Sequence, residues 1–221
     1  MSEIDLMRFY PRSKRPIGER AQLITNAHRA VARQFGQAFF DGDRLYGYGG
    51  YQYHPRFWQQ TVRYMRDHYA LADDSEILDV GCAKGFMLHD FKQAIPRARV
   101  VGVDVSSYAV VHAIDTMRPF LCVADTKALP FPSRSFDLVV SINTVHNLPL
   151  EECKQAIREI QRVSRRHAFL MVDAWQTEEE HRRMLAWNLT ALTYMHVSDW
   201  KRVFDEVGYT GDYWWFIADS A

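Results

Sequence analysis

From Glu76 onward the sequence alternates short, continuously apolar runs with amphipathic segments, and this alternation restricts the fold more than any other feature. The apolar runs are EILDVG (76–81), ARVVGVDVS (98–106), FLCVAD (120–125), SFDLVVSIN (135–143) and HAFLMVDA (167–174). Each run has the length of a buried strand. Strands that are apolar on both faces occur in parallel sheets that helices cover on each side. The sequence therefore predicts an α/β fold with a doubly wound, mainly parallel sheet.

Segments of helical period separate these runs. GFMLHDFKQAI (85–95) follows the first run, and LEECKQAIREIQRV (150–163) gathers its apolar residues on one face. Ser106 is placed to cap a helix that we expect to reach Met117. Near the end, HVSDWKRVFDEVGYTGDYWWF (196–216) predicts one more helix, a glycine stop and a strand.

The first 74 residues follow a different pattern. Apolar residues recur at helical spacing from Glu19 to Phe39, which predicts one long helix. Pro55 can occupy the first position of a second helix. Between them lies DGDRLYGYGGYQY (41–53), whose interleaved glycines and tyrosines indicate a shaped loop or lid. We expect residues 1–74 to form a helical, Tyr/Gly-rich cap within the same domain as a core at 75–221.

Composition argues against several classes of partner. The 221 residues include 27 Lys and Arg and 27 Asp and Glu, so no net field attracts nucleic acid. A basic cluster at Arg12, Lys14 and Arg15 is interpreted as a solvated arm. No signal peptide or membrane-spanning run is visible, and the three cysteines lack metal-ligand spacing. We expect a cytoplasmic protein with no nucleic-acid, membrane or metal partner, and we expect Cys122 to lie in the core.

The turn after the first predicted strand indicates a nucleotide-type pocket. In a doubly wound sheet, ligands bind at the carboxyl ends of the strands, where main-chain N–H groups are available. Gly81, Ala83 and Gly85 would let a ligand approach the backbone there. The dinucleotide fingerprint G-x-G-x-x-G is absent, because Phe86 stands where its third glycine would be.

The string LDVGCAKG resembles the first motif of the class I S-adenosylmethionine-dependent methyltransferases, in which a strand ends in D-x-G-x-G-x-G. The family resemblance extends over ALPF, SFDLVV and SINTVHNL, roughly from Ser75 to Phe216. It implies a Rossmann-like fold and S-adenosylmethionine as the cofactor. Ala83 replaces the usual middle glycine, and we do not expect the second strand of the family's closing hairpin.

The resemblance also implies which residues contact the cofactor. Asp79 and the turn Gly81–Gly85, including Ala83, would hold the methionine part. Asp104 ends the second strand, where an acid can accept hydrogen bonds from both ribose hydroxyls. The remaining cofactor contacts are expected at positions that follow strands: Val105, Asp125, Thr126 and Asn143. Of these, Asp125 would meet the adenine amino group.

Residues beyond the cofactor turn are candidates for acting on the acceptor. His146 lies in the loop after the fourth strand and could serve as a base near neutral pH. Tyr51, in the Tyr/Gly-rich segment, could position the acceptor through its hydroxyl. Tyr48, Asn147 and Tyr194 are candidate substrate contacts.

The sequence thus favours methyl transfer to an oxygen or nitrogen of a small-molecule acceptor, with the cap setting specificity. The base is needed only if the acceptor carries a weakly acidic proton. Two alternatives stay open, namely a nicotinamide-dependent oxidoreductase and a non-catalytic S-adenosylmethionine-binding protein. A homodimer is compatible with the sequence.

Overall fold

The computed structural model describes residues 1–11 and 17–218 of the chain. The basic cluster at Arg12, Lys14 and Arg15 lies outside these residues. The described residues form a seven-stranded sheet of order β3-β2-β1-β4-β5-β6, and β7 also pairs with β5. The strands are β1 (Glu76–Val80), β2 (Arg99–Asp104), β3 (Leu121–Val123), β4 (Phe136–Ile142), β5 (Ser164–Trp175), β6 (Met195–His196) and β7 (Asp212–Phe216). All of these strand pairs are parallel, which confirms the predicted fold class.

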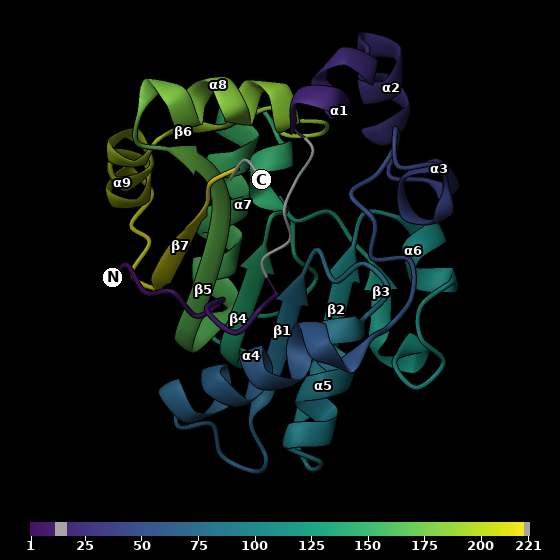
Figure 1. Cartoon of the computed structure of the whole chain (residues 1–221). Helices are drawn as coiled ribbons and strands as arrows, with labels where there is room; N and C mark the ends of the chain where they lie inside the picture. The colour runs from purple at the N-terminus through teal and green to yellow at the C-terminus, as the bar shows by residue number, and fades with distance from the viewer. Residues whose placement is uncertain (12–16, 219–221) are drawn as a thin grey trace.

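Helices cover both faces of the sheet (Figure 1). The longer ones are α4 (Pro55–His68), α5 (Phe86–Ala94), α7 (Leu150–Val163) and α9 (Val197–Glu206). Successive strand residues point to opposite faces, so Ile77 packs in the cluster beneath α4 and α5, while Leu78 packs in the cluster beneath α7 and α9. Both side chains are fully buried. Burial on both faces explains why the strands are continuously apolar in sequence.

The N-terminal cap contains three short helices, so the single helix predicted from Glu19 to Phe39 is wrong. The helices are α1 (Ile17–Leu23), α2 (Asn26–Ala32) and α3 (Gln37–Asp41). Thr25 starts α2 through a capping box with His28, and Phe35 adopts a left-handed φ of 48° immediately before Gly36, the N-cap of α3. These local signals override the helical spacing of the apolar residues.

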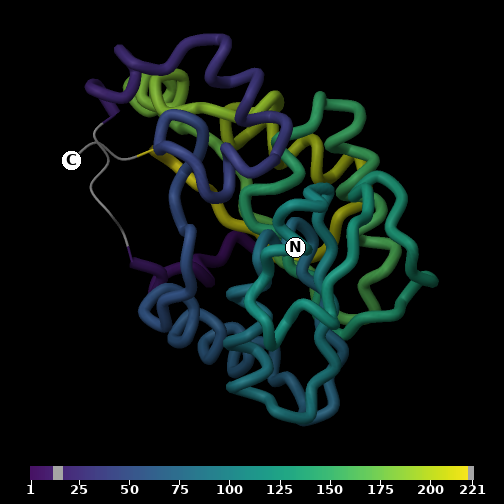
Figure 2. Tube along the Cα trace, turned by 90° about the vertical axis from the view of Figure 1, so that its right-hand side faces the viewer, coloured from purple at the N-terminus to yellow at the C-terminus, as the bar shows by residue number. Residues whose placement is uncertain are grey.

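Helices α1 to α3 lie beyond the carboxyl ends of the strands, with α1 next to α8 (Glu178–Trp187), whereas α4 covers one face of the sheet (Figure 1). We therefore call α1 to α3, with the Tyr/Gly-rich segment that follows them, the cap. Figure 2 shows the Tyr/Gly-rich segment, in blue, running along one side of the molecule from α3 to α4. Pro55 occupies the first turn of α4, as predicted, and His54 caps that helix. None of the described helices has the length and apolar character needed to cross a membrane.

Two other details differ from the predictions. Ser106 does cap a helix, but α6 (Ser107–Val111) ends well before Met117 and is followed by the 3₁₀ turn η1 (Arg118–Phe120). Cys122 is exposed rather than in the core. The reason is its position on β3, an edge strand that pairs only with β2 and turns only Leu121 inward.

At the opposite edge, the N-terminus extends the sheet beside β7. The amide of Ile4 donates to the carbonyl of Tyr213, and the amide of Tyr213 donates to the carbonyl of Ser2, each over 3.0 Å. In the described residues β7 is the last strand, and residues 2–4 lie along its free edge. This pairing carries the following residues, including Asp5 and Met7, to the carboxyl ends of the strands.

Candidate cofactor and acceptor site

The turn between β1 and α5 is held in left-handed conformations. Gly81, Ala83 and Gly85 have φ values of 85°, 49° and 78°. The amides of Gly81 and Cys82 both donate to the carbonyl of Val103, over 2.7 and 3.0 Å, which ties the turn to β2. The positive φ values alone account for the small residues at these positions, whether or not a ligand binds. Residues with L side chains avoid the left-handed region of φ/ψ space.

The two glycines also have close protein neighbours. A Cβ added to Gly81 would lie 2.0 Å from Oγ1 of Thr144, and one added to Gly85 would lie 3.0 Å from Cβ of Met117. The sequence alone suggested that the glycines make room for a ligand. The structure adds that the turn needs Gly81 for its packing against the loop after β4 and Gly85 for its packing against Met117 and Leu121.

Two buried carboxylates flank this turn. Asp104 is 7% exposed, and its two oxygens accept the amides of Ala83 and Ser106, each over 2.8 Å. Asp79 is 5% exposed, and burial, reinforced by the charge of Asp104, raises its pKa to about 8. Burial also raises the pKa of Asp104 above its usual range, against the lowering effect of its hydrogen bonds. A ligand that brings positive charge and hydroxyl donors would stabilise both carboxylates.

S-adenosylmethionine fits these requirements, since it carries an ammonium, a sulfonium and two ribose hydroxyls. Beyond Asp104 the strand ends are open, with Val105 58% exposed and Asp125 exposed, while Thr126 is buried. An adenine ring has apolar faces and an amino group. The exposed side chain of Val105 offers an apolar surface for the ring, and Asp125 offers an acceptor for the amino group. We call Asp79, the turn Gly81–Gly85, Asp104 and Asp125 the cofactor edge.

A partly buried ion pair joins the cap to the cofactor turn. Lys84, inside the turn, pairs with Asp41 at the end of α3, and its Nζ also donates to the carbonyl of Tyr51 over 3.0 Å. The second oxygen of Asp41 accepts the hydroxyl of Tyr108 over 2.9 Å. Ser106, next to Asp104, donates its hydroxyl to the cap at the carbonyl of Phe35. We call the contacts of Lys84 with Asp41 and Tyr51 the cap latch.

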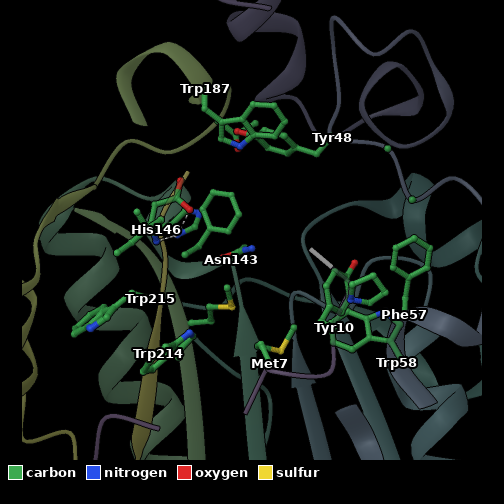
Figure 3. Close-up of a pocket in the computed structure, with 18 of the residues that line it drawn as sticks. Met7, Tyr10, Tyr48, Phe57, Trp58, Asn143, His146, Trp187, Trp214 and Trp215 are labelled. Carbon is green, nitrogen blue, oxygen red and sulfur yellow. Dashed lines mark hydrogen bonds and ion pairs between the residues drawn. The ribbon is translucent and has the colours of Figure 1, made fainter. Parts of the chain in front are cut away.

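Beside the cofactor edge lies a cavity of about 590 Å³ (Figure 3). We call it the aromatic cavity because rings dominate its walls, and its aromatic lining residues are Tyr10, Phe39, Tyr48, Phe57, Trp58, Phe86, Trp187, Trp214, Trp215 and Phe216. In Figure 3, Tyr10, Phe57 and Trp58 lie across the open space from His146 and Asn143. Four of the six tryptophans in the chain line this cavity, a concentration that the sequence pattern alone did not indicate.

His146 lines the cavity, but its geometry opposes the predicted role of general base. It is 3% exposed, and its Nδ1 accepts the backbone amide of Asp173 over 2.9 Å. Burial lowers its pKa to about 3, so the ring is neutral at physiological pH. With Nδ1 accepting a hydrogen bond, the neutral ring carries its proton on Nε2 and can only donate from there. Asp173, which the sequence analysis did not assign to the acceptor, also lines the cavity.

The other predicted acceptor residues divide into two groups. Asn147 and Tyr48 line the cavity, and so does Asn143, which was predicted to contact the cofactor. The Tyr48 hydroxyl accepts the amide of Leu189 over 2.8 Å, and burial, with the nearby charge of Asp173, raises its pKa to about 12.

Tyr51 and Tyr194 are not among the lining residues. The Tyr51 hydroxyl is buried without a hydrogen-bond partner among the described residues, and Tyr194 packs beside Met184 and Trp187. Their assigned roles therefore receive no support from the cavity.

Several residues of the cavity wall were missed because they come from distant segments. Met7 and Tyr10 belong to the N-terminal segment, and Trp187 and Trp214 belong to α8 and β7. Trp58 reaches the cavity from α4. Among the described residues, no group of three or more His, Cys, Asp and Glu side chains could hold a metal ion.

Comparisons with known proteins agree with this geometry. Residues 77–167 match a family model described as a methyltransferase domain. The tRNA (carboxymethyluridine(34)-5-O)-methyltransferase of Arabidopsis thaliana is 30% identical over 144 residues, covering 65% of this chain and 33% of the relative. Malonyl-[acyl-carrier protein] O-methyltransferase from Hahella chejuensis is 39% identical over 70 residues, covering 30% of this chain and 25% of the relative.

The solved structure of the YcgJ protein from Bacillus subtilis superposes with a TM-score of 0.54 at 19% identity, covering 66% of each chain, so it supports the fold alone. The fold is Rossmann-like, as in the structural neighbours. Residues 77–167, less than half of the chain, match the methyltransferase domain, and class I S-adenosylmethionine-dependent methyltransferases share this fold. The chain spans a quarter to a third of the length of the two curated relatives.

Proposed function

We propose that this protein transfers a methyl group from S-adenosylmethionine to an oxygen or nitrogen of a small-molecule acceptor. The observation that carries the proposal is that the aromatic cavity reaches the cofactor turn at Phe86, the residue after Gly85, while the buried carboxylates of Asp79 and Asp104 flank the same turn. Small-molecule pockets usually enclose about 300–1,000 Å³. The volume of about 590 Å³ lies within that range and supports an acceptor enclosed by the protein.

The cofactor edge supplies binding. Asp79 holds the ammonium of the methionine part, which lies against the small residues of the turn Gly81–Gly85, Asp104 accepts the ribose hydroxyls, and Val105 with Asp125 receives the adenine. S-adenosylmethionine supplies an electrophilic methyl group to the acceptor's lone pair, and its sulfur keeps the electrons of the broken carbon–sulfur bond.

The cavity supplies alignment and exclusion of water. His146 donates from Nε2 to the acceptor, and Asn143 and Asn147 lie on the same loop to orient it. Asp173 replaces His146 as the group that receives the acceptor's proton, because it is a carboxylate that lines the same cavity. The chain's main contribution is thus a fixed geometry between the acceptor and the methyl group.

Two alternatives differ in ligand or in acceptor. A nicotinamide-dependent oxidoreductase would also use an acid at Asp104, but the turn lacks the dinucleotide spacing. The curated relatives act, according to their names, on a tRNA and on an acyl-carrier protein. The balance of 27 basic and 27 acidic residues gives no general attraction to RNA, which favours the small acceptor.

Calorimetry followed by a transfer assay tests the proposal. S-adenosylhomocysteine should bind in the micromolar range, while NAD should not bind. Protein incubated with methyl-labelled S-adenosylmethionine and a metabolite extract should then move label into a low-molecular-weight product. NAD binding would favour the oxidoreductase, cofactor binding without transfer would favour the non-catalytic protein, and label recovered in RNA or protein would contradict the small-molecule acceptor.

A further inference from the structure

The polar residues of the aromatic cavity include amide side chains and four acidic residues. The acidic residues are Glu3, Asp5, Asp173 and Glu180. They already have protein contacts, such as the 2.8 Å ion pair between Glu3 and Lys201. A carboxylate offers about four lone-pair sites, so each can accept further hydrogen bonds. A ligand that satisfies these carboxylates must bring donors.

Charge in the cavity opposes an anionic ligand. Among the described lining residues, Arg44 is the one arginine or lysine, and its guanidinium already donates to the carbonyl of Tyr48. His146 is neutral, because burial lowers its pKa to about 3. A second negative charge brought among four carboxylates would be repelled and would lose its hydration.

Aromatic rings form two opposing walls (Figure 3). Tyr10 and Trp58 lie together with ring centroids 4.8 Å apart, and Tyr48 and Trp187 lie together with centroids 5.6 Å apart. Trp214 contributes a third surface, on the other side of the view from Tyr10 and Trp58. Ring faces bury flat apolar groups well, while the carboxylates around them bind polar groups at the edges of the same ligand.

We propose that the part of the acceptor that enters the cavity is a hydroxylated ring without negative charge, such as a sugar ring. Its apolar faces lie against the rings of Trp58 and Trp214, and its hydroxyls donate to the carboxylates of Glu3, Asp173 and Glu180. One hydroxyl faces Asn143 and becomes the methylated oxygen. This inference rests on the proposed function, because it specifies the acceptor of that reaction.

The test measures ring binding to the full chain saturated with S-adenosylhomocysteine. The probes are methyl pyranosides of gluco, galacto and manno configuration, each compared with its 2-amino-2-deoxy and its uronate counterpart. We expect at least one configuration to bind saturably, with its neutral or amino form at least tenfold tighter than its uronate. Equal or tighter binding of the uronate, or no saturable binding by any probe, overturns the proposal.

Matched variants locate the binding. Trp58→Ala and Trp214→Ala should each weaken the bound pyranoside at least tenfold, whereas Trp175→Ala should not, because Trp175 packs against His181 and does not line the cavity. Retained binding of S-adenosylhomocysteine shows that each variant is folded. Unchanged pyranoside binding in both folded cavity variants contradicts the proposal.

A charge variant tests the selection against acids. Glu3→Gln keeps the shape of the side chain and removes one charge, so it should narrow the preference for the neutral ring over the uronate by at least threefold. An unchanged preference contradicts the role of the carboxylates. Failure of the proposed function would instead appear as absent binding of S-adenosylhomocysteine, which is measured without any ring probe.

Discussion

The cofactor edge and the aromatic cavity are neighbours at the same end of the sheet, yet they are built differently. The cofactor edge consists of residues at or just after the carboxyl ends of β1, β2 and β3 and is fixed by hydrogen bonds such as that from the Ala83 amide to Asp104. The cavity is assembled from the N-terminus, the Tyr/Gly-rich segment, the loop after β4, α8 and β7. The positions in the first region are set mainly by neighbouring strands, and those in the second depend on how distant segments pack together.

This difference separates the two tasks of the site. The residues at the strand ends would hold the cofactor, which is the same molecule whatever the acceptor is. The residues supplied by the cap and by α8 would contact the acceptor, and they can be substituted without disturbing the sheet. Variants of the cofactor edge should therefore alter cofactor affinity and leave ring binding intact, and variants of the cavity should do the reverse.

The largest effect is expected for Asp104→Ala. Each lost charge-assisted hydrogen bond is worth about 1.5–3 kcal/mol, so affinity for S-adenosylhomocysteine should fall about 100-fold. Asp125→Ala is the matched control, since Asp125 is exposed and should cost less than tenfold. Calorimetry compares the two. Similar small losses in both variants would remove Asp104 from the cofactor site.

Gly81→Ala tests where the two regions touch. Its φ of 85° and a Cβ 2.0 Å from Thr144 should together cost about 2–4 kcal/mol of unfolding free energy through strain and overpacking. Gly208→Ala is the control, because its φ is 69° but nothing lies within 4 Å of its Cβ. That variant should lose only about 1–2 kcal/mol from the left-handed conformation. Equal losses in denaturant titrations would show that the contact with Thr144 is unimportant.

The same difference explains what could be predicted from sequence. The fold and the cofactor edge could be predicted, because Asp79 and Asp104 sit at strand ends that the apolar runs define. The broken helix at 19–39 was missed because the capping box of Thr25 outweighs apolar spacing. The cavity was missed because Tyr10 reaches it only through the pairing of residues 2–4 with β7, a contact between the two ends of the sequence.

A smaller effect concerns pH at the cofactor edge. Burial and Asp104 raise the pKa of Asp79 to about 8, above its value in the unfolded chain, so the folded state binds the extra proton. The ligand-free protein should therefore lose stability as pH rises from about 5 to about 8. Affinity for the cationic cofactor should rise over about pH 7–9, as the carboxylate ionises.

Asp79→Asn separates this titration from others in the protein. The variant should bind S-adenosylmethionine more weakly at pH 9 and should lose most of the pH dependence of both melting temperature and affinity. Because Asp79 and Asp104 interact, the observed midpoint belongs to the pair. Wild-type pH dependence in Asp79→Asn would assign the titration elsewhere.

The smallest effect is expected at the cap latch, which joins the two regions. The Lys84 side chain is 8% exposed and that of Asp41 is 28% exposed, so the two partners differ in what their removal leaves behind. Asp41→Asn leaves a buried ammonium with only the Tyr51 carbonyl, whereas Lys84→Met leaves a carboxylate that water and Tyr108 can still reach. Asp41→Asn should therefore cost more unfolding free energy, and the double variant should cost less than the sum of the two.

In hydrogen exchange, amides of residues 46–53 should lose protection in both variants and regain part of it when S-adenosylhomocysteine binds the turn. Additive losses of stability, with unchanged exchange of residues 46–53, would show that the cap is held by packing and not by the latch.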